Sequence, residues 1–475
     1  MTVQLNQAIG KVPPNGNPVV ANRYGADPYA LVFKDRVYLY MTHDALEYDG
    51  SGAIIENTYS SINKIAVISS CDLINWTDHG EIRVAGPDGA AKWATQSWAP
   101  AAVHKVIEGK DKFFLYFANN ASGIGVLTSD SPEGPWVDPI GEALILRSTP
   151  GVEDVTWLFD PAVLVDDDGK SYIYFGGGVP EGQYAEPGTA RVMKLGEDMT
   201  SVVGTAEVIP APFMFEDAGI HKREGIYYYT YCSNFYDGER PEGSPPAGEI
   251  AYMTSNKPMG PWTYHKTILK NPGHFFGVSG NNHHAIFQFH DEWYIAYHAQ
   301  TLSKAQGIAN GYRSTHLGRI FHNEDGSIRE VEADYKGVQQ IKPLCPYQHV
   351  QAVTMGWSAG VKTAFEAAAG ERVVTDIDSG DWIGLAGVDF GSKGAVAFCA
   401  TVISLEDGGA IELHLDDPAG QLIGELPVPA ANGPVKQREL KTEVKGVEGT
   451  RDLYLVFIGN TGTPLFQLVS WQFMQ

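Results

Sequence analysis

Five segments of this chain resemble one another, and their repetition limits the folds that the chain can adopt. They begin at Asp27, Trp98, Phe159, Phe215 and Asn281, and the third reads "FDPAVLVDDDGKSYIYFGG". Each combines a polar residue, a strand of small apolar residues, a charged turn and an aromatic strand. The segments start about 55 to 70 residues apart, which suits one four-stranded unit per repeat.

Short apolar runs bounded by Gly, Pro, Asn and Asp also fill the sequence between these segments, and helical periodicity is scarce. Pieces such as "CDLINWTDHG", "SDSPEGPWVD" and "SNKPMGPWTY" fit the outer strand and turn of successive units. The sequence therefore predicts an all-β protein in which residues 1–343 close into a five-bladed β-propeller.

The innermost strand of a propeller blade directs its leading end toward the central axis. The polar residues that open the repeated segments are therefore expected to meet in one cavity; these are Asp27, Asp160, Glu216 and His283. Repulsion and partial burial push the pKa values of neighbouring carboxyl groups apart, so that one site can hold an acid and a base at the same pH. Hydrolysis of a glycosidic bond requires such a pair. For Glu216 the alternative is a solvent-facing position at the start of a strand.

The charge of the chain limits its partners. Its 475 residues include 34 basic and 57 acidic ones, a formal charge of -23, which would repel nucleic acid and anionic membranes, so neither is expected as a partner. No stretch approaches the roughly 18 consecutive apolar residues of a membrane helix, and the first residues lack the pattern of a signal peptide. The four cysteines form no CxxC pair and are expected to be free and mostly buried. We expect a cytoplasmic protein, or a secreted one whose signal has been removed, with the first favoured.

Six motifs, in order along the chain, resemble glycoside hydrolase family 43. They are "GADPYA", "SWAP", "FDPAVLVDDDGKSYIYFGG", "FEDAGIHKREGIYYYTY", "NNHHAIF" followed by "WYIAYH", and "YRSTHLGRI". The resemblance covers roughly the first 343 residues and implies an inverting hydrolase of arabinose- and xylose-containing polysaccharides on a five-bladed propeller. It also implies that Asp27 is the general base, that Asp160 orients the acid and tunes its pKa, and that Glu216 is the general acid. The apolar neighbours of Glu216 would keep it protonated near neutral pH.

The resemblance implies roles for three further residues. His283 takes the place of a family histidine that binds calcium through a largely aqueous shell; the alternative is a histidine hydrogen-bonded to Asp or water, because calcium prefers oxygen ligands. Arg313 matches a family arginine that reaches into the pocket, with an exposed salt bridge as the alternative. Trp98 is expected to form a wall for the sugar ring, with core packing as the alternative. No organic cofactor is expected, and the acidic triplet 166–168 is interpreted as a turn.

Residues 344–475 alternate in the manner of a β-sandwich and resemble a family 6 carbohydrate-binding module. The module usually opens with paired glutamates and carries an aspartate before its final Trp, whereas this chain has "VTMGWSAG" and Ser470 before Trp471, so its structural calcium is expected to be absent. The loop "PAANGPVKQREL" has no aromatic residue to stack on a sugar. We expect a structural or weakly binding module with Trp382 and Trp471 in its core.

The leading functional hypothesis is an exo-acting glycosidase that releases α-L-arabinofuranose, β-D-xylose or both from arabinoxylan or xylo-oligosaccharides. The insertions "GHFFGVSG" and "SNFYDGERPEGSPPAGEI" are long enough to close one side of a pocket, as exo action requires. An endo-arabinanase and a catalytically silent carbohydrate-binding propeller are the alternatives. The pentose preference and the oligomeric state stay open.

Overall fold

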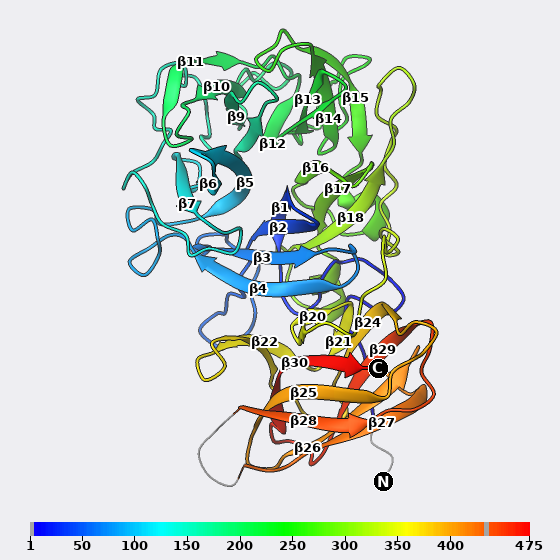
Figure 1. The fold of residues 1–475 in the computed structure, drawn as a ribbon. Helices are drawn as coiled ribbons and strands as arrows, with labels where there is room; N and C mark the ends of the chain where they lie inside the picture. The colour runs from blue at the N-terminus through cyan, green and yellow to red at the C-terminus, as the bar shows by residue number, and fades with distance from the viewer. Residues whose placement is uncertain (1–3, 432–436) are drawn as a thin grey trace. The chain divides into compact units, whose positions relative to one another are not determined.

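The computed structural model describes residues 4–431 and 437–475 (Figure 1). The chain separates into two compact units. One comprises Tyr24–Val67 and Glu81–Asp334, and the other comprises Met1–Arg23, Ile68–Gly80 and Tyr335–Gln475. Two segments from the first part of the chain thus belong to the same unit as the C-terminal residues. The predicted domain boundary between residues 343 and 344 stays a prediction.

Antiparallel sheets fill residues 26–320, and each begins with one of the repeated segments. Two short helices, α1 (Pro272–Phe276) and α2 (Thr301–Gln306), interrupt the strands of the described residues. In order from the innermost strand, the sheets are β1 (Ala26–Phe33), β2 (Arg36–Thr42), β3 (Lys64–Ser70) and β4 (Trp76–Arg83); β5 (Trp98–Ile107), β6 (Lys110–Ala118) and β7 (Ile124–Ser129); β8 (Ala162–Val165), β9 (Ser171–Phe175), β10 (Arg191–Leu195) and β11 (Val202–Val208); β12 (Met214–Arg223), β13 (Ile226–Ser233), β14 (Ile250–Ser255) and β15 (Thr263–Leu269); and β16 (His284–Phe289), β17 (Glu292–Ala299) and β18 (Ser314–Ile320).

The innermost strands of these sheets form a closed ring (Figure 1). Strand β1 contacts β5 and β16, β8 contacts β5 and β12, and β12 contacts β16. Buried apolar side chains fill the spaces between neighbouring sheets, as where Tyr174 and Tyr229 stack with their ring centroids 6.1 Å apart. This is the propeller-type architecture that the repeats predict, and it gathers the leading ends of the inner strands around one axis.

The C-terminal residues of the second unit form a sandwich of two sheets, so the predicted β-sandwich is confirmed. Trp382 and Trp471 lie in its buried core, at 3% and 1% exposure, as expected. Residues 432–436 of the loop without aromatic residues lie outside the described part of the chain. One sheet runs β22 (Lys362–Glu366), β23 (Glu371–Thr375), β30 (Phe466–Met474), β25 (Ala397–Ser404) and β28 (Gln437–Glu443), with β19 (Val350–Gln351) on β30; the other runs β21 (Trp357–Ala359), β24 (Trp382–Asp389), β29 (Thr450–Ile458), β26 (Gly409–Leu415) and β27 (Gln421–Val428); and β20 (Thr354–Met355) pairs with the start of β4.

The cysteines, the acidic triplet 166–168 and the helices bear on three further expectations. None of the four cysteines, all of which lie in the described residues, forms a disulfide bond, but only Cys232 and Cys399 are buried, and Cys345 is exposed. The acidic triplet 166–168 forms a turn in which Asp166 accepts hydrogen bonds from Lys222 and Tyr227. In the described residues, no helix is long and apolar enough to cross a membrane.

Candidate active site

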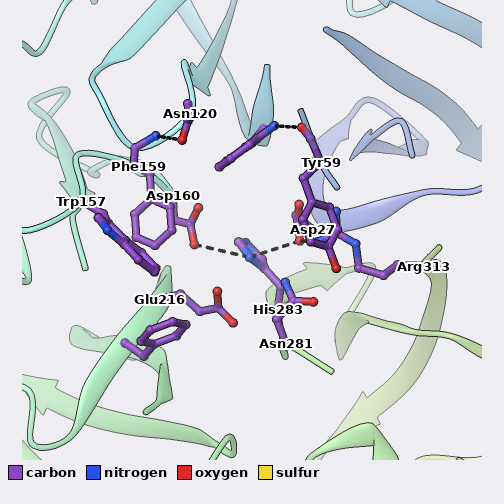
Figure 2. Close-up of a pocket in the computed structure, with 13 residues that line it drawn as sticks. Asp27, Tyr59, Asn120, Trp157, Phe159, Asp160, Glu216, Asn281, His283 and Arg313 are labelled. Atoms are coloured by element: carbon purple, nitrogen blue, oxygen red, sulfur yellow. Dashed lines mark hydrogen bonds and ion pairs between the residues drawn. The ribbon is translucent and has the colours of Figure 1, made fainter. Parts of the chain in front are cut away.

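The inner strands surround a cavity of about 440 Å³ on the propeller axis (Figure 2). Every site residue expected from the sequence lines it, and the rest of its wall is largely aromatic and amide. The lining residues are Asp27, Tyr59, Trp98, Asn120, Ala121, Trp157, Phe159, Asp160, Phe215, Glu216, Asn281, His283 and Arg313. The fold therefore brings together six residues that are spread over 287 positions of the sequence, from residue 27 to residue 313.

A backbone irregularity at the start of the inner strands aims these side chains. The pairing of β1, β5 and β12 with the next strand slips by one residue, between Ala26 and Tyr29 in the case of β1. The residue inside each slip has a positive φ, 46° at Asp27, 38° at Ala99 and 68° at Asp217, and Asp160 before β8 has a φ of 48°. Non-glycine residues adopt this conformation at a cost, and such bulges re-aim side chains beside functional sites.

The irregularity shows which residues are structurally equivalent. Asp217, not Glu216, occupies the position of Asp27 and Asp160, and Glu216 stands one residue earlier, where the second segment has Trp98. The interpretation of Glu216 as the polar residue that opens its segment was therefore wrong by one position, although Glu216 does line the cavity. The sequence hides this equivalence, because the equivalent residues of the first three segments all precede a proline, whereas Asp217 precedes Ala218.

Asp217 is a residue that the sequence reading missed. Its side chain is fully buried and accepts the backbone N–H of His284 at 3.1 Å. It also contacts the imidazole of His284 and lies 3.1 Å from Nε2 of His283. His284 thus points away from the cavity, toward Asp217 and Thr230, while His283 faces the cavity, as expected of consecutive strand residues.

Asp27 is held as a carboxylate. Nη1 of Arg313 donates to its Oδ1 at 2.9 Å, and Nδ1 of His298 lies 3.2 Å from the same oxygen. Burial alone would raise the pKa of Asp27, but the positive charge of Arg313, with smaller contributions from His283 and His298, holds this pKa well below its ordinary value. Asp27 is therefore ionised at neutral pH, as a general base must be.

Glu216 is in the opposite state. The residue is 7% exposed, and its Oε1 has no hydrogen-bond partner among the described residues. Burial, followed by the negative charges of Asp160 and Asp27, raises the pKa of Glu216 well above its ordinary value. Phe215 beside it packs edge-on against Trp157, with ring centroids 5.2 Å apart, which excludes water from this wall. Glu216 therefore keeps its proton at neutral pH, as a general acid must.

Asp160 is the third buried carboxyl group that lines the cavity. The backbone N–H of Asp217 donates to its Oδ2 at 2.9 Å. Burial and the charge of Asp27 raise the pKa of Asp160 well above its ordinary value. When Asp160 is ionised, its negative charge is one of the causes that raise the pKa of Glu216, and this helps Glu216 to keep its proton.

Arg313 is buried rather than part of an exposed salt bridge. Its side chain is 5% exposed and makes ion pairs with Asp27 and with Asp44, a second carboxylate that the sequence reading missed. Burial opposes the charge of the guanidinium, but these two carboxylates raise the pKa of Arg313 above its ordinary value.

Trp98, which was expected to form a wall for the sugar ring, is half-buried in the cavity lining. Its Nε1–H donates to the carbonyl of Tyr59 at 3.2 Å.

The surroundings of His283 can be tested against the expected calcium ion. Its Nδ1 faces Asp27 and Asp160, at 3.6 and 3.7 Å (Figure 2). Its Nε2 faces Asp217. Among the described residues, no group of three or more His, Cys, Asp or Glu side chains has the geometry of a metal site. These residues therefore form no cage of protein ligands for calcium, which takes six to eight oxygen ligands. The predicted calcium ion stays a prediction.

Comparison with known proteins identifies the family. Residues 15–328 match the model for glycosyl hydrolases family 43, and residues 351–475 match that for carbohydrate binding module (family 6). The arabinoxylan arabinofuranohydrolase of Paenibacillus polymyxa is 52% identical over 483 residues, covering 98% of this chain and 76% of that protein. The arabinoxylan arabinofuranohydrolase of Bacillus subtilis (strain 168) is 53% identical, covering 97% of this chain and 93% of that protein.

A solved structure is similar along the whole chain. The crystal structure of a family 43 arabinoxylan arabinofuranohydrolase from Bacillus subtilis, in complex with cellotetraose, has a TM-score of 0.95 and 52% identity, covering 99% of both chains. The propeller, its cavity of carboxyl groups and these similarities define a glycoside hydrolase. The chain belongs to glycoside hydrolase family 43, a family of inverting enzymes, and carries a family 6 carbohydrate-binding module, so the resemblance read from the sequence is confirmed.

Proposed function

We propose that this protein is an exo-acting α-L-arabinofuranosidase that removes arabinofuranose side chains from arabinoxylan. One observation carries the proposal: a single cavity holds two carboxyl groups in opposite surroundings, Asp27, whose pKa is lowered, and Glu216, whose pKa is raised. This is the pair that an inverting glycosidase requires. The substrate named for the relatives from Paenibacillus polymyxa and Bacillus subtilis supports arabinoxylan.

In the proposed reaction, Asp27 takes a proton from a water molecule while that water attacks the anomeric carbon. Glu216 donates its proton to the glycosidic oxygen on the opposite face of the sugar, and the bond between that oxygen and the anomeric carbon breaks. The products are arabinose of inverted configuration and a main chain in which the sugar that carried the arabinose has a free hydroxyl group. Asp160 supports the step by keeping Glu216 protonated until the glycosidic oxygen takes the proton.

The size of the cavity supports exo action. At about 440 Å³ it lies toward the lower end of the roughly 300–1,000 Å³ of ligand pockets, which suits a terminal sugar better than a long groove. Trp98, Trp157 and Phe215 offer apolar faces that pack well against the C–H surface of a sugar ring. β-D-Xylose is the second candidate product, because a xylosidase/arabinosidase of Humicola insolens is 29% identical over 66% of this chain.

A chromatographic inventory of the released sugars tests the proposal. Arabinoxylan and, in parallel, xylobiose are incubated with the protein, with Glu216→Gln and with Glu224→Gln, a matched control in the exposed turn after β12. Free arabinose from the polymer, lost in Glu216→Gln and kept in Glu224→Gln, is expected. Oligosaccharides without monomer would indicate an endo-acting enzyme, and no product would indicate a carbohydrate-binding propeller.

The compartment and partners belong to the same proposal. The four cysteines, all in the described residues, form no disulfide bond, which supports a reducing compartment such as the cytoplasm, and cell fractionation tests this location. The charge of -23 supports a neutral oligosaccharide as the partner rather than nucleic acid or an anionic membrane.

A further inference from the structure

We propose that Asp44 is a positioning residue for the catalytic base, because it fixes the guanidinium of Arg313 in the orientation in which Arg313 binds Asp27. The proposal rests on the role of Asp27 proposed above. Asp44 lies just after β2, its side chain is fully buried, and it does not line the cavity. Its effect on the reaction must therefore pass through Arg313.

Asp44 and Arg313 form a paired, two-pronged contact. Nε of Arg313 donates to Oδ2 of Asp44 at 3.0 Å, and Nη2 donates to Oδ1 at 2.8 Å. The backbone N–H of Arg313 donates to the same Oδ2 at 2.8 Å. A bidentate pair of this kind fixes the plane of the guanidinium as well as its position. The remaining nitrogen, Nη1, is thereby directed at Asp27.

The neighbours of Arg313 complete the support. The ring of Tyr59 lies over the guanidinium, with Cζ 4.9 Å from the ring centroid. The carbonyl of Arg313 accepts the backbone N–H of Gly25 at 2.9 Å, two residues before Asp27. Without Asp44, two buried donors of the guanidinium would lack partners, and burial of such donors is costly.

The arrangement also decides which oxygen of Asp27 can act. Among the described residues, the contacts of the Asp27 carboxylate with Arg313, His298 and His283 all involve Oδ1. Oδ2 is left to take the proton of the attacking water. If the guanidinium of Arg313 rotated, it could bind both oxygens of Asp27, and neither oxygen would be left to accept the proton of water.

Asp44→Asn tests the proposal, because the amide keeps the shape but turns a donor toward the donors of Arg313. We expect kcat on arabinoxylan to fall about 10- to 100-fold, the cost of a small misplacement of a catalytic group, while KM changes less than about threefold. Asp49→Asn, the same substitution in the exposed loop that follows, is the control and should leave kcat unchanged. Circular dichroism and thermal unfolding confirm that each variant is folded.

A double-mutant cycle separates positioning from a general structural role. In an Arg313→Ala background, Asp44→Asn should cause no further loss of kcat, because its route to Asp27 is already gone. Losses that multiply, an unchanged kcat in folded Asp44→Asn, or a rise in KM alone would overturn the proposal. If Asp44→Asn does not fold, Asp44→Glu takes its place, because it keeps the negative charge but displaces the two oxygens that bind Arg313. The same results for kcat and KM then support or overturn the proposal.

The proposed role of Asp27 is tested separately in the same assay. Asp27→Asn should abolish turnover while the protein stays folded. If Asp27→Asn retains activity, the assignment of the base fails, whatever Asp44 does. If Asp27→Asn is inactive and the losses at Asp44 and Arg313 multiply, only the positioning role of Asp44 fails.

Discussion

The backbone N–H of Asp217 donates to Oδ2 of Asp160 at 2.9 Å and so joins the opening of β12 to the carboxylate that precedes β8. The side chain of Asp217 in turn accepts from His284 and faces His283, at the opening of β16. One buried aspartate therefore ties together the leading ends of three sheets beside the catalytic cavity.

We predict that Asp217→Asn lowers both stability and turnover. The amide keeps one oxygen that can accept from the backbone of His284, but its NH2 group can only donate, so it turns a donor toward an imidazole that the carboxylate now contacts as an acceptor. A buried polar group left unpaired costs about 1–3 kcal/mol of unfolding free energy. Urea unfolding followed by fluorescence measures the change, with Asp168→Asn in the exposed turn as the control. Equal stability of the Asp217 variant and the parent would contradict the role given to Asp217.

The activity that Glu216→Gln loses should depend on how strongly the leaving group of the substrate requires protonation. On arabinoxylan we expect kcat to fall about 10²- to 10⁴-fold, the usual contribution of a positioned acid. On 4-nitrophenyl α-L-arabinofuranoside the loss should be much smaller, since nitrophenolate departs without a proton. Steady-state kinetics on both substrates measure the difference. An equal loss on both would show that Glu216 is not the acid.

The pH dependence of kcat/KM should follow the opposite shifts of the two carboxyl groups. Asp27 must be ionised, and because Arg313 lowers its pKa, activity should persist to pH values below the ordinary range of an aspartate. Glu216 must be protonated, and because burial raises its pKa, activity should fall only when the pH rises through that raised value. A pH profile from acid to alkaline pH checks both limbs. An alkaline fall near the ordinary pKa of a glutamate would contradict the second assignment.

Deletion of residues 344–475 should destabilise what remains. Residues 1–23 and 68–80 belong to the same compact unit as the C-terminal residues, and Trp76, which is fully buried, pairs with Met355. Deletion would expose this apolar surface. Solubility and thermal unfolding of residues 1–343 measure the effect. A stable, soluble fragment that has lost only binding to polysaccharide would contradict this prediction.

The sequence was sufficient for the fold class and for several residues that line the cavity, because both leave local patterns. Alternation of apolar residues reveals a strand, and a polar residue at the head of each repeat reveals which strand ends meet at the axis. Asp27, Asp160 and His283 could be found in this way. The strands of the C-terminal sandwich were visible for the same reason.

Asp44 and Asp217 could not be identified from the same patterns. Asp44 follows β2 rather than opening an inner strand, and its partner Arg313 is 269 residues away, so only the folded chain brings them together. Asp217 was overlooked because a shift in the pairing of β12 with β13 makes it equivalent to Asp27, and the sequence pattern does not show this shift. The exposure of Cys345 was missed because a lone cysteine carries no periodic signal.

The configuration of the first sugar released tests the central claim most directly. Proton NMR spectra recorded within the first turnovers of an α-L-arabinofuranoside distinguish the two anomers before they equilibrate. If Asp27 activates water opposite Glu216, β-L-arabinofuranose appears first, and no arabinose forms with Asp27→Asn. If α-L-arabinofuranose appears first, a covalent intermediate has formed, and the assignment of Asp27 as a base acting through water is wrong.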